Sequence, residues 1–352
     1  MQGNKKKILV TGASGRVGYR VLSQLVWNHP EYQINAFDLK TKKSVKRLTE
    51  FGNKVAVVYG DITDAESVRK ICTDVDIAIH LAAIIPPLAE DDPGFANKVN
   101  VEGTRNIVQQ LERYSPNAFL MYSSSISVYA DRIDDPYIRV GDPIRANAIG
   151  DEYTKTKIAA EQIIRNSSLD WTIFRLCGIM GEHKMSRLMF YMPLKTPMEI
   201  ATAEDAARAF VHAIEKRSEV SKQIFNLGGG EQMRITYEDF LSRSFTMMGL
   251  GKVDFPPNHF AEKNFHGGHY TDSDTLEDIL HFRRDTVDSY FAEFSNSKSN
   301  FEKRMIRLLR KPIKYFLAKM SDPYKAVKTG DQRMITAFFS DIKEKHTKIT
   351  SE

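Results

Sequence analysis

Cysteine is nearly absent from this chain. Its 352 residues include only Cys72 and Cys177, which indicates that no disulfide framework holds the fold and that a reducing compartment is the expected environment. A large charge of one sign is also absent: the formal net charge is +5, which gives no indication of a nucleic-acid partner. With 42% hydrophobic and 27% charged residues, the composition is that of a globular protein long enough for one large core or two domains.

Long hydrophobic runs are missing too. The longest, residues 77–88, is interrupted by His80 and broken by Pro86 and Pro87, so it is too short to span a bilayer. Near the N-terminus, Lys5–Lys7 lead into a short apolar segment and a glycine turn, not into the apolar core of a secretory signal. These absences predict a cytoplasmic location.

Short apolar segments alternate with helical patterns along much of the chain. Helical periodicity extends over Val17–Trp27 and Ala203–Glu215. Seven segments have the composition of buried strands: Lys7–Thr11, Gln33–Leu39, Val55–Tyr59, Ile77–Leu81, Ala118–Ser123, Trp171–Leu176 and Gln223–Leu227. Strands separated by helices predict an α/β fold with a doubly wound parallel sheet covered on both faces.

The pattern divides the chain into three predicted regions. Residues 1–177 carry the regular alternation. Residues 178–294 form a small lobe, interleaved with elements that return to the main sheet at about 203–227. Residues 295–352 form a basic helical tail that follows a linker rich in serine and asparagine.

The tail contains an amphipathic pattern over Phe301–Met320. Apolar residues recur there at helical spacing, and lysines and arginines fill much of the remainder. Pro312 is expected to kink or split this helix, because proline lacks the N–H that an internal helical position donates. Two interpretations stay open: contact with an anionic membrane surface through 301–320, or packing on the protein's own lobe or on a partner subunit.

A glycine-rich turn follows the first predicted strand. Gly12, Gly15 and Gly18 are spaced three residues apart, where the strand ends and the helix from Val17 begins. This is the context of a dinucleotide-binding turn. Its glycines let the backbone approach a pyrophosphate, and the helix N-terminus supplies N–H groups.

Asp38 ends the second predicted strand, twenty residues after Gly18. A carboxylate at this place accepts hydrogen bonds from the ribose hydroxyls and repels a 2′-phosphate. We therefore predict NAD as the cofactor in preference to NADP, although Lys40, Lys42 and Lys43 lie close enough to keep NADP open.

Two later strand ends fit the same cofactor. Asp61 and Ile62 follow the third strand, where a side chain could meet the adenine. Leu81, Ala82 and Ala83 follow the fourth strand, where small residues allow the backbone to approach the cofactor.

Tyr153 and Lys157 are four residues apart in a segment with helical character. That spacing places both side chains on one face of a helix. An ammonium beside a phenol favours the phenolate, so this pair predicts a tyrosine with a lowered pKa that exchanges a proton near neutral pH.

Taken together, these segments resemble the extended short-chain dehydrogenase/reductases, a family of NAD-dependent epimerases, dehydratases and 3β-hydroxysteroid-type dehydrogenases. The resemblance covers roughly residues 5–290 and implies a Rossmann-type sheet with a small C-terminal substrate lobe, to which the helical tail is appended. The matching pieces occur in the family's order: Thr11–Gly18, Asp61–Ile62, His80–Ala83, Asn100–Thr104, Ser123–Tyr129, Tyr153–Lys157, Glu161, Arg175, Asp205 and Asn226–Gly229.

The resemblance implies an enzyme with a Ser-Tyr-Lys site, and a homodimer. Ser125 would bond to the substrate oxygen, Tyr153 would be the general acid or base, and Lys157 would hold the nicotinamide ribose and lower the pKa of the tyrosine. The cofactor contacts that it implies are Gly12, Ser14, Gly15, Arg16, Val17, Gly18, Asp38, Asp61, Ile62, Leu81, Ala82, Ala83, Asn100, Tyr153 and Lys157.

Two reactions fit this machinery. We favour oxidation of a secondary alcohol or reduction of a carbonyl; the alternative is a nucleotide-sugar epimerase or dehydratase with retained NAD. Gly178 stands where sugar-nucleotide members carry an asparagine, and Pro197–Thr202 contains no arginine, which favours an uncharged or apolar substrate. Three arginines could still bind a phosphate: Arg187, Arg234 and Arg283. A cofactor-binding regulator without activity is disfavoured, because both Tyr153 and Lys157 are kept.

The remaining candidates are histidines. His80 is expected to pack in the core rather than act as a base. His266 and His269 lie in a glycine loop without carboxylate or thiolate partners at ligand spacing. We therefore predict no metal site and interpret this loop as part of the substrate lobe.

Overall fold

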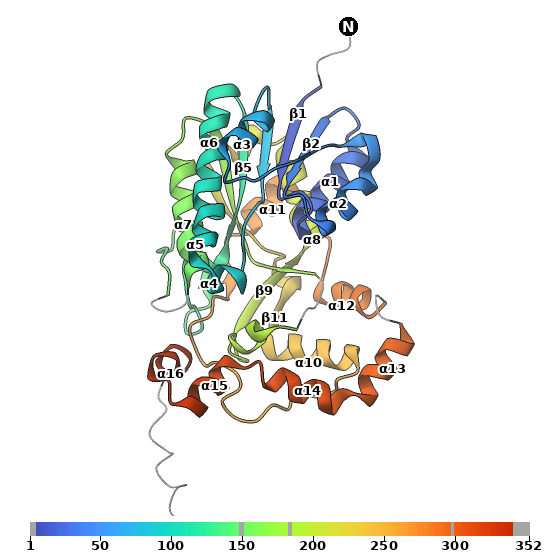
Figure 1. Ribbon diagram of the computed structural model, residues 1–352, viewed down its shortest axis with the longest axis vertical. Coiled ribbons are helices and arrows are strands. Elements are labelled where there is room, and N and C mark those ends of the chain that lie inside the picture. Colours follow the sequence, from blue (N-terminus) through green and yellow to red (C-terminus); the bar gives the residue numbers. More distant parts are fainter. Residues whose placement is uncertain (1–4, 148–150, 182–184, 297–298, 341–352) are drawn as a thin grey trace, which may run out of the picture.

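In the residues that the computed structural model describes (5–147, 151–181, 185–296 and 299–340), a seven-stranded parallel sheet organises the larger part of the molecule (Figure 1). The strand order is β10-β7-β5-β4-β1-β2-β3. The strands are β1 (Lys7–Thr11), β2 (Gln33–Asp38), β3 (Ala56–Tyr59), β4 (Ile77–His80), β5 (Phe119–Ser125), β7 (Asp170–Leu176) and β10 (Gln223–Leu227). The order reverses between β1 and β4, the kind of switch point at which open α/β sheets bind ligands.

All seven strands predicted from the sequence are present, with small differences at their ends. The largest functional difference is in β5, which runs to Ser125, two residues past its predicted end. Ser124 and Ser125 extend the strand because they pair with Arg175 and Leu176 of β7. The hydroxyl of Ser125 is therefore held at the carboxyl edge of the sheet.

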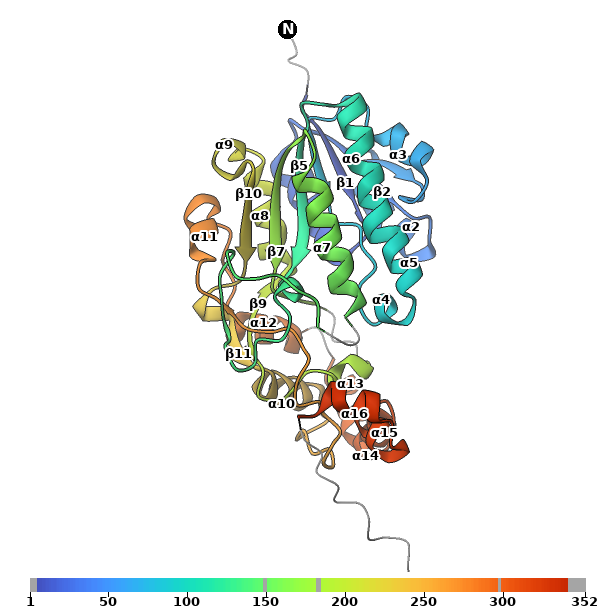
Figure 2. The ribbon, with the colours of Figure 1, turned by 90° about the vertical axis from the view of Figure 1, so that its left-hand side faces the viewer.

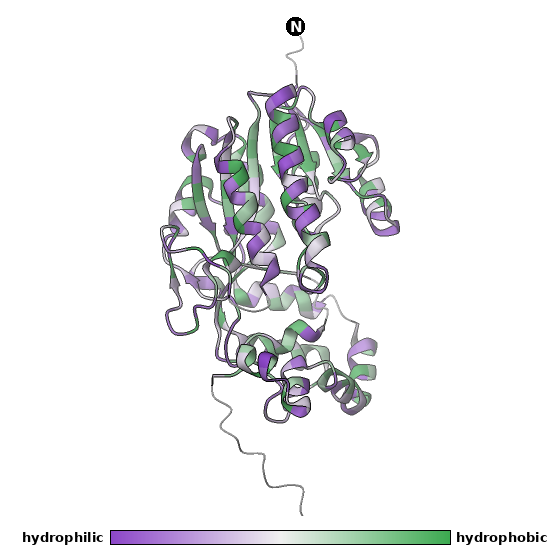
Figure 3. Cartoon of the chain, turned by 60° about the vertical axis from the view of Figure 1, so that its left-hand side comes forward, coloured by the Kyte–Doolittle hydropathy of each residue, from purple (hydrophilic) through white to green (hydrophobic). Residues whose placement is uncertain are grey.

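Helices cover both faces of the sheet, as Figures 1 and 2 show. Side chains alternate along β1, so Ile8 and Val10 pack on one face and Leu9 on the other. The first face is covered by α1 (Arg16–Asn28), α2 (Lys42–Leu48), η1 (Thr49–Lys54), α8 (Ala203–Ala213), α9 (Arg217–Val220) and α11 (Asp274–Leu280). The second face is covered by α3 (Ala65–Ile71), the π-helical turn η2 (Lys98–Glu102), α6 (Gly103–Tyr114) and α7 (Glu152–Arg165). Figure 3 shows that the strands are largely apolar and that the polar residues of the helices lie mainly on their outer sides.

A smaller lobe lies beyond the carboxyl edge of the sheet (Figure 1). Its short strands form two sheets, β11-β9-β8 and β12-β6. The elements of this part are β6 (Tyr137–Ile138), β8 (Gly178–Met180), η4 (Arg187–Phe190), β9 (Pro197–Thr202), η5 (Glu231–Met233), β11 (Arg234–Thr236), α10 (Tyr237–Met248), β12 (His269–Tyr270) and α12 (Val287–Asn296). Three further short elements of the described residues are α4 (Leu88–Asp91), α5 (Pro93–Asn97) and η3 (Ile126–Tyr129).

In its described residues, 299–340, the tail forms four short helices. They lie along the outer side of the lobe (Figure 1). They are α13 (Asn300–Leu308), α14 (Arg310–Ala318), α15 (Asp322–Thr329) and α16 (Gln332–Phe338). The predicted helix over 301–320 is split at Leu309, since Pro312 has no N–H to offer the carbonyl of Leu308, four residues earlier. The predicted linker is shorter than expected: α12 reaches Asn296 and α13 starts at Asn300. Ser297, Lys298 and residues 341–352 lie outside the described residues.

One face of α13 and α14 packs on the protein's own lobe. Ile306, Ile313 and Leu317 join the lobe's apolar cluster, which includes Phe245 of α10 and Phe291 of α12. The opposite face carries large apolar side chains in contact with solvent. The structure therefore supports the packing interpretation for one side of these helices and leaves the other side uncovered by described residues.

Neighbouring residues of α14 test this two-sided arrangement. Leu317 is 7% exposed and Phe316 is 63% exposed. We expect Leu317→Ala to lower the free energy of unfolding by about 2–4 kcal/mol, because it leaves a cavity in the lobe. Phe316→Ala, the matched control, is expected to change it by less than about 0.5 kcal/mol. Urea denaturation of the two variants measures both values, and equal losses would contradict the described packing.

Candidate functional site

The turn between β1 and α1 is built around glycines that no other residue can replace without displacing backbone. Gly12 has a φ of +65°, and a Cβ there would lie 2.7 Å from the backbone nitrogen of Ala82. A Cβ on Gly18 would lie 2.4 Å from the carbonyl oxygen of Gly12. The chain thus leaves an open concave backbone at the N-terminus of α1, the feature that a pyrophosphate requires.

Asp38 lies against this turn. Its Oδ2 accepts a hydrogen bond from the backbone N–H of Ser14 (2.7 Å), and its Oδ1 accepts one from that of Leu39 (2.8 Å). Arg47 donates to the carbonyl oxygen of Ser14 at 2.9 Å. The carboxylate is partly exposed beside the turn, so it keeps acceptor capacity for a hydroxyl-bearing ligand.

The other predicted cofactor residues around this turn differ in where their side chains lie and in how exposed they are. Arg16 extends toward the lobe and donates to the carbonyl oxygen of Ile179 at 2.8 Å. Val17 packs beneath the turn against the core. Asp61 is exposed and caps its own turn, while Ile62 is 6% exposed and packs inward against α6.

Asn100 and the segment after β4 form a support beneath the site. The Asn100 amide accepts from the N–H of Ile84 (2.7 Å) and donates to its carbonyl oxygen (2.9 Å). It also donates to Oγ1 of Thr156 in α7 at 2.9 Å. Leu81 and Ala82 both hydrogen-bond back to Thr11 at the end of β1. The loop that contains Ala83 is thereby tied to both β1 and α7.

His80 has the packing role expected from the sequence. Its ring is fully buried between the hydroxyls of Thr11 (2.7 Å) and Thr104 (2.9 Å). Burial, helped by the charge of Lys157, lowers its pKa to about 3. The His80 ring is neutral and has a hydroxyl partner on each nitrogen, so it links Thr11 at the end of β1 to Thr104 of α6.

Ser125 and Tyr153 meet at the end of β5. Burial raises the pKa of Tyr153 to about 12, and a hydrogen bond with the Ser125 side chain lowers it in part. Oγ of Ser125 also accepts from the N–H of Ser127 at 3.1 Å, which orients it. At neutral pH this geometry presents a protonated phenol beside an oriented hydroxyl.

Lys157 is 2% exposed on the inner side of α7. Its Nζ donates to the carbonyl oxygen of Ser123 (2.7 Å) and to the hydroxyl of Tyr122 (3.2 Å), and lies 5.7 Å from the ring centroid of Tyr153. Burial lowers the Lys157 pKa to about 7, although the charge of Glu161 acts in the opposite direction. The lowered tyrosine pKa expected from the Tyr-Lys spacing is not found, because burial is the main influence on the pKa of Tyr153 and raises it.

A carboxylate that sequence reasoning missed caps the N-terminus of α7. Glu90 of α4 accepts hydrogen bonds from the backbone N–H groups of Glu152 and Tyr153, each at 3.0 Å. A negative charge there complements the positive end of the helix dipole. Glu90 and Tyr153 are 63 positions apart in the chain, so no local signal predicts this contact, which helps to fix the position of Tyr153 relative to the sheet.

A buried ion pair holds α7 against β7. Glu161 and Arg175 are 1% and 3% exposed at their side chains and form two parallel hydrogen bonds of 3.0 and 2.8 Å. Ser124 donates to the same carboxylate at 2.5 Å. The pair therefore links α7, β7 and the strand end that carries Ser125.

The network continues from Arg175 across the sheet. Arg175 donates to the hydroxyl of Tyr129 at 2.8 Å, and this hydroxyl donates to the side-chain oxygen of Asn226 at 2.8 Å. Asn226 in turn donates to Asp272 at 2.8 Å. Four neighbouring elements, α7, β7, η3 and β10, are thereby held in one hydrogen-bonded unit.

A cavity of about 110 Å³ adjoins Ser125 on its lobe side. Its wall is mostly apolar, with Met192, Met198 and Phe265 among its residues. His266 also lines it, and burial lowers the pKa of this histidine to about 4, so the ring is neutral at pH 7. The glycine loop with two histidines thus forms part of the pocket wall beside Ser125.

The three arginines considered for a phosphate are engaged by the protein. Arg187 pairs with Asp91. Arg234 pairs with Glu199 at 3.3 Å, and Arg283 donates to the carbonyl oxygen of Gly228 at 2.9 Å. None of these three guanidinium groups lines the cavity beside Ser125 in the described part of the chain.

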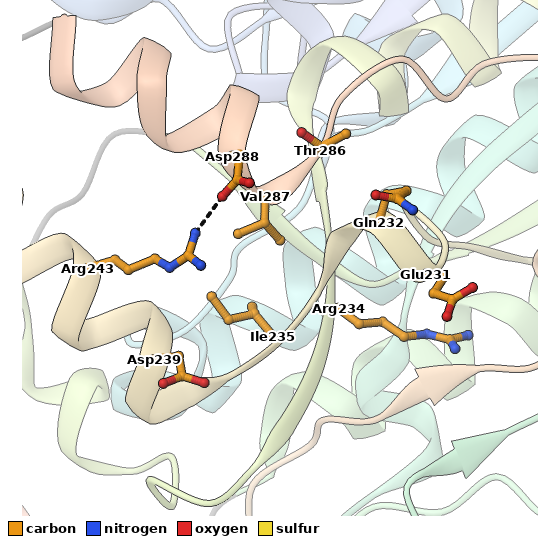
Figure 4. A pocket seen from close by; sticks show the side chains of 9 residues that line it. All are labelled: Glu231, Gln232, Arg234, Ile235, Asp239, Arg243, Thr286, Val287 and Asp288. Carbon is orange, nitrogen blue, oxygen red and sulfur yellow. Dashed lines mark hydrogen bonds and ion pairs between the residues drawn. The ribbon is translucent and has the colours of Figure 1, made fainter.

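A larger and more open groove of about 340 Å³ lies between β11, α10 and the start of α12 (Figure 4). Its charges are mixed: Arg243 pairs with Asp288 at 2.7 Å across one side, and Glu231 and Arg234 lie at the other. Ser125, Tyr153 and Lys157 are not among its lining residues, so it is separate from the site at the sheet edge.

Comparison with known proteins adds sequence relatives. A model of the 3-beta hydroxysteroid dehydrogenase/isomerase family matches residues 9–178. The 3 beta-hydroxysteroid dehydrogenase type 7 of Mus musculus is 26% identical over 200 residues, which are 53% of this chain and 54% of that protein. The dTDP-glucose 4,6-dehydratase of Mycobacterium tuberculosis (strain ATCC 25618 / H37Rv) is 29% identical over 161 residues, 45% and 48% of the two chains. The chain spans about half the length of these curated relatives.

Solved structures share the fold. UDP-glucuronic acid 4-epimerase from Bacillus cereus, in complex with UDP-glucuronic acid and NAD, has a TM-score of 0.69 at 18% identity and covers 85% of this chain and 99% of its own. DesIV, a dTDP-glucose 4,6-dehydratase from Streptomyces venezuelae with NAD and TYD bound, has a TM-score of 0.68 at 19% identity and covers 87% and 99%.

The buried ion pair makes a prediction about stability. Arg175→Met leaves the carboxylate of Glu161 buried without its cation, so we expect the free energy of unfolding to fall by about 3–5 kcal/mol. Arg243→Met removes an exposed pair and serves as the matched control, with an expected loss of about 0–1 kcal/mol. Urea denaturation checks both, and similar small losses in the two variants would refute the structural weight given to this pair.

Proposed function

Because the chain belongs to the extended short-chain dehydrogenase/reductase family, we propose that it is an NAD-dependent oxidoreductase that oxidises a secondary alcohol or reduces the corresponding carbonyl. The observation that carries this proposal is the protonated, half-buried phenol of Tyr153, which lies beside Ser125 at the carboxyl edge of the sheet and one helical turn from Lys157.

The residues around the first turn fit NAD. Gly12 and Gly18 leave backbone exposed where a side chain would collide, and α1 offers its N-terminal N–H groups to a pyrophosphate. The carboxylate of Asp38 has acceptor capacity for ribose hydroxyls and would repel a 2′-phosphate. When bound, the nicotinamide accepts or delivers a hydride.

The proton chemistry belongs to the chain's own residues. Tyr153 donates its proton to the substrate oxygen in the reducing direction and takes one back in the oxidising direction. Ser125 hydrogen-bonds to the same oxygen and orients it. Lys157 supplies the buried cation beside this pair and would hold a ribose hydroxyl. A Tyr153 pKa of about 12 keeps the proton in place at neutral pH, the state that carbonyl reduction needs.

An uncharged, mostly apolar substrate fits the cavity best. Methionine and phenylalanine side chains form much of its wall. The titratable residues that line it are Glu199, which pairs with Arg234, and neutral His266, which is available to a substrate hydroxyl or carbonyl. Gly178 stands where sugar-nucleotide members of the family carry an asparagine, so it offers no side-chain amide to a substrate diphosphate. The arginines nearby already have protein partners, Arg234 with Glu199 and Arg283 with Gly228.

The second candidate is a nucleotide-sugar dehydratase or epimerase, favoured by the identity to dTDP-glucose 4,6-dehydratase. The same Tyr153 would act, but hydride would return to the same substrate, so no net NADH would accumulate. Release of NADH with an apolar alcohol would support the dehydrogenase. Conversion of a nucleotide sugar with NAD retained on the protein would support the dehydratase or epimerase.

The homodimeric assembly and the cytoplasmic location both stay predictions. Among the described residues, no helix is both long and apolar enough to pass through a bilayer. Contact of residues 301–320 with a membrane surface is likewise a proposal, and it rests on the exposed side of α13 and α14, not on the site.

Replacement of the phenol tests the proposed chemistry. We expect Tyr153→Phe to lower turnover by roughly 100- to 10,000-fold, because the general acid or base is lost, while NAD binding is kept. Tyr137→Phe, at a tyrosine that is 60% exposed, is the control and should retain turnover. NADH formation with a panel of apolar secondary alcohols, together with calorimetric NAD binding, measures both. Wild-type turnover in Tyr153→Phe rules out the assigned role.

The cofactor preference depends on the charge of Asp38. Asp38→Asn keeps an acceptor for the N–H of Ser14 but removes the negative charge, so the ratio of NAD to NADP affinity should fall roughly 10- to 100-fold. Asp76→Asn is the control, because Asp76 accepts from the backbone N–H of Lys7 at the opposite end of the sheet. Calorimetry with both cofactors reads the ratio. An unchanged ratio in Asp38→Asn contradicts its place at the ribose.

A further inference from the structure

The tail concentrates exposed apolar side chains on one short stretch. Thirteen large hydrophobic residues are exposed in the described part of the chain, and six of them lie in residues 301–316. Those six are Phe301 (73%), Met305 (40%), Leu308 (71%), Leu309 (49%), Tyr315 (59%) and Phe316 (63%). Single exposed apolar residues are ordinary on a protein surface, but such a concentration marks an interaction surface.

Cations accompany these side chains. Arg304, Arg307, Arg310 and Lys311 are exposed on the same two helices, and Glu302 is the one acidic residue in 301–320. No ion pair joins these four cations to another described residue. The docking face, defined as the six apolar residues and four cations named here, is therefore both apolar and strongly basic.

Packing beneath the docking face holds it in place. Leu317 and Ile313 bury the opposite side of α14 in the lobe, and Nζ of Lys314 donates to the carbonyl oxygen of Lys252 at 2.6 Å. The split at Leu309 lets both short helices follow the outer side of the lobe, where Figures 1 and 2 show them away from the sheet. The apolar side chains thus have no route into the protein's own core.

We propose that the docking face binds the surface of an anionic lipid bilayer. Apolar side chains next to arginines and lysines are the composition by which amphipathic helices lie in the headgroup layer. Phe301, Leu308 and Phe316 enter the interfacial region, and the neighbouring cations contact lipid phosphates. Association of two copies through this face is opposed, because a symmetric contact places the same unpaired cations against each other.

Vesicle sedimentation of the full chain tests the proposal, with phosphatidylcholine vesicles that either contain or lack phosphatidylserine. We expect wild-type protein to sediment with the phosphatidylserine vesicles and to be released by added salt. The triple variant R304Q/R307Q/R310Q should bind roughly 100-fold more weakly, since each basic residue near an anionic surface contributes about a fivefold factor. The variant F301S/L308S/F316S should bind much more weakly, because it removes three of the six apolar side chains of the docking face.

Matched controls change the same kinds of residue elsewhere. K54Q/K70Q/K98Q removes three exposed cations, and W27S removes a side chain that is 70% exposed, so both should bind like wild type. Unchanged urea denaturation confirms that each variant is folded. The proposal is overturned if wild type fails to sediment with phosphatidylserine vesicles, or if the arginine variant binds as tightly as wild type. It is also overturned if F301S/L308S/F316S converts a soluble dimer to a monomer, because the face then joins two copies. None of these readouts depends on catalysis.

Discussion

The buried ion pair between Glu161 and Arg175 is the contact on which the arrangement of the site depends. It joins α7, which carries Tyr153 and Lys157, to β7, the strand between β5 and β10, and both partners are almost entirely shielded from water. Such a pair tolerates little displacement, because either charge alone would be buried at high cost. Arg175 also donates a hydrogen bond to Tyr129. The position of α7 relative to the sheet is therefore set by a hydrogen-bonded network as well as by helix packing.

The same pair shapes the electrostatics of Lys157. Arg175 engages both carboxylate oxygens of Glu161, so the ammonium one turn away bonds to neutral oxygens, the carbonyl of Ser123 and the hydroxyl of Tyr122. A buried cation with neutral acceptors has a lowered pKa, about 7 here. The site therefore contains one cation that is paired with a carboxylate and one amine that has only neutral acceptors.

Much of the fold could be predicted because buried parallel strands are short apolar runs and each was visible in the sequence. The Tyr153–Lys157 spacing likewise follows from helical geometry. Other features arise from contacts between segments far apart in the chain and have no local pattern. Glu90 reaches α7 from a different helix, His266 reaches the cavity through an irregular loop, and Arg187 is paired with Asp91 rather than left open for a phosphate. The direction of the Tyr153 pKa shift was mispredicted because spacing reveals a neighbouring charge but not the depth of burial.

Tyr270 gives the pocket wall an unusual freedom to change over evolutionary time. Its hydroxyl donates to the carbonyl oxygen of Arg175 (3.0 Å) and its N–H donates to Glu199 (3.1 Å), so the chain is anchored directly after the loop of residues 265–268. Gly267 and Gly268 have no room for a side chain, but substitutions at Phe265 and His266 can reshape the wall beside Ser125 while the anchor keeps the buried network intact. Selection for a new substrate can thus act on a few residues without eroding the machinery that they serve.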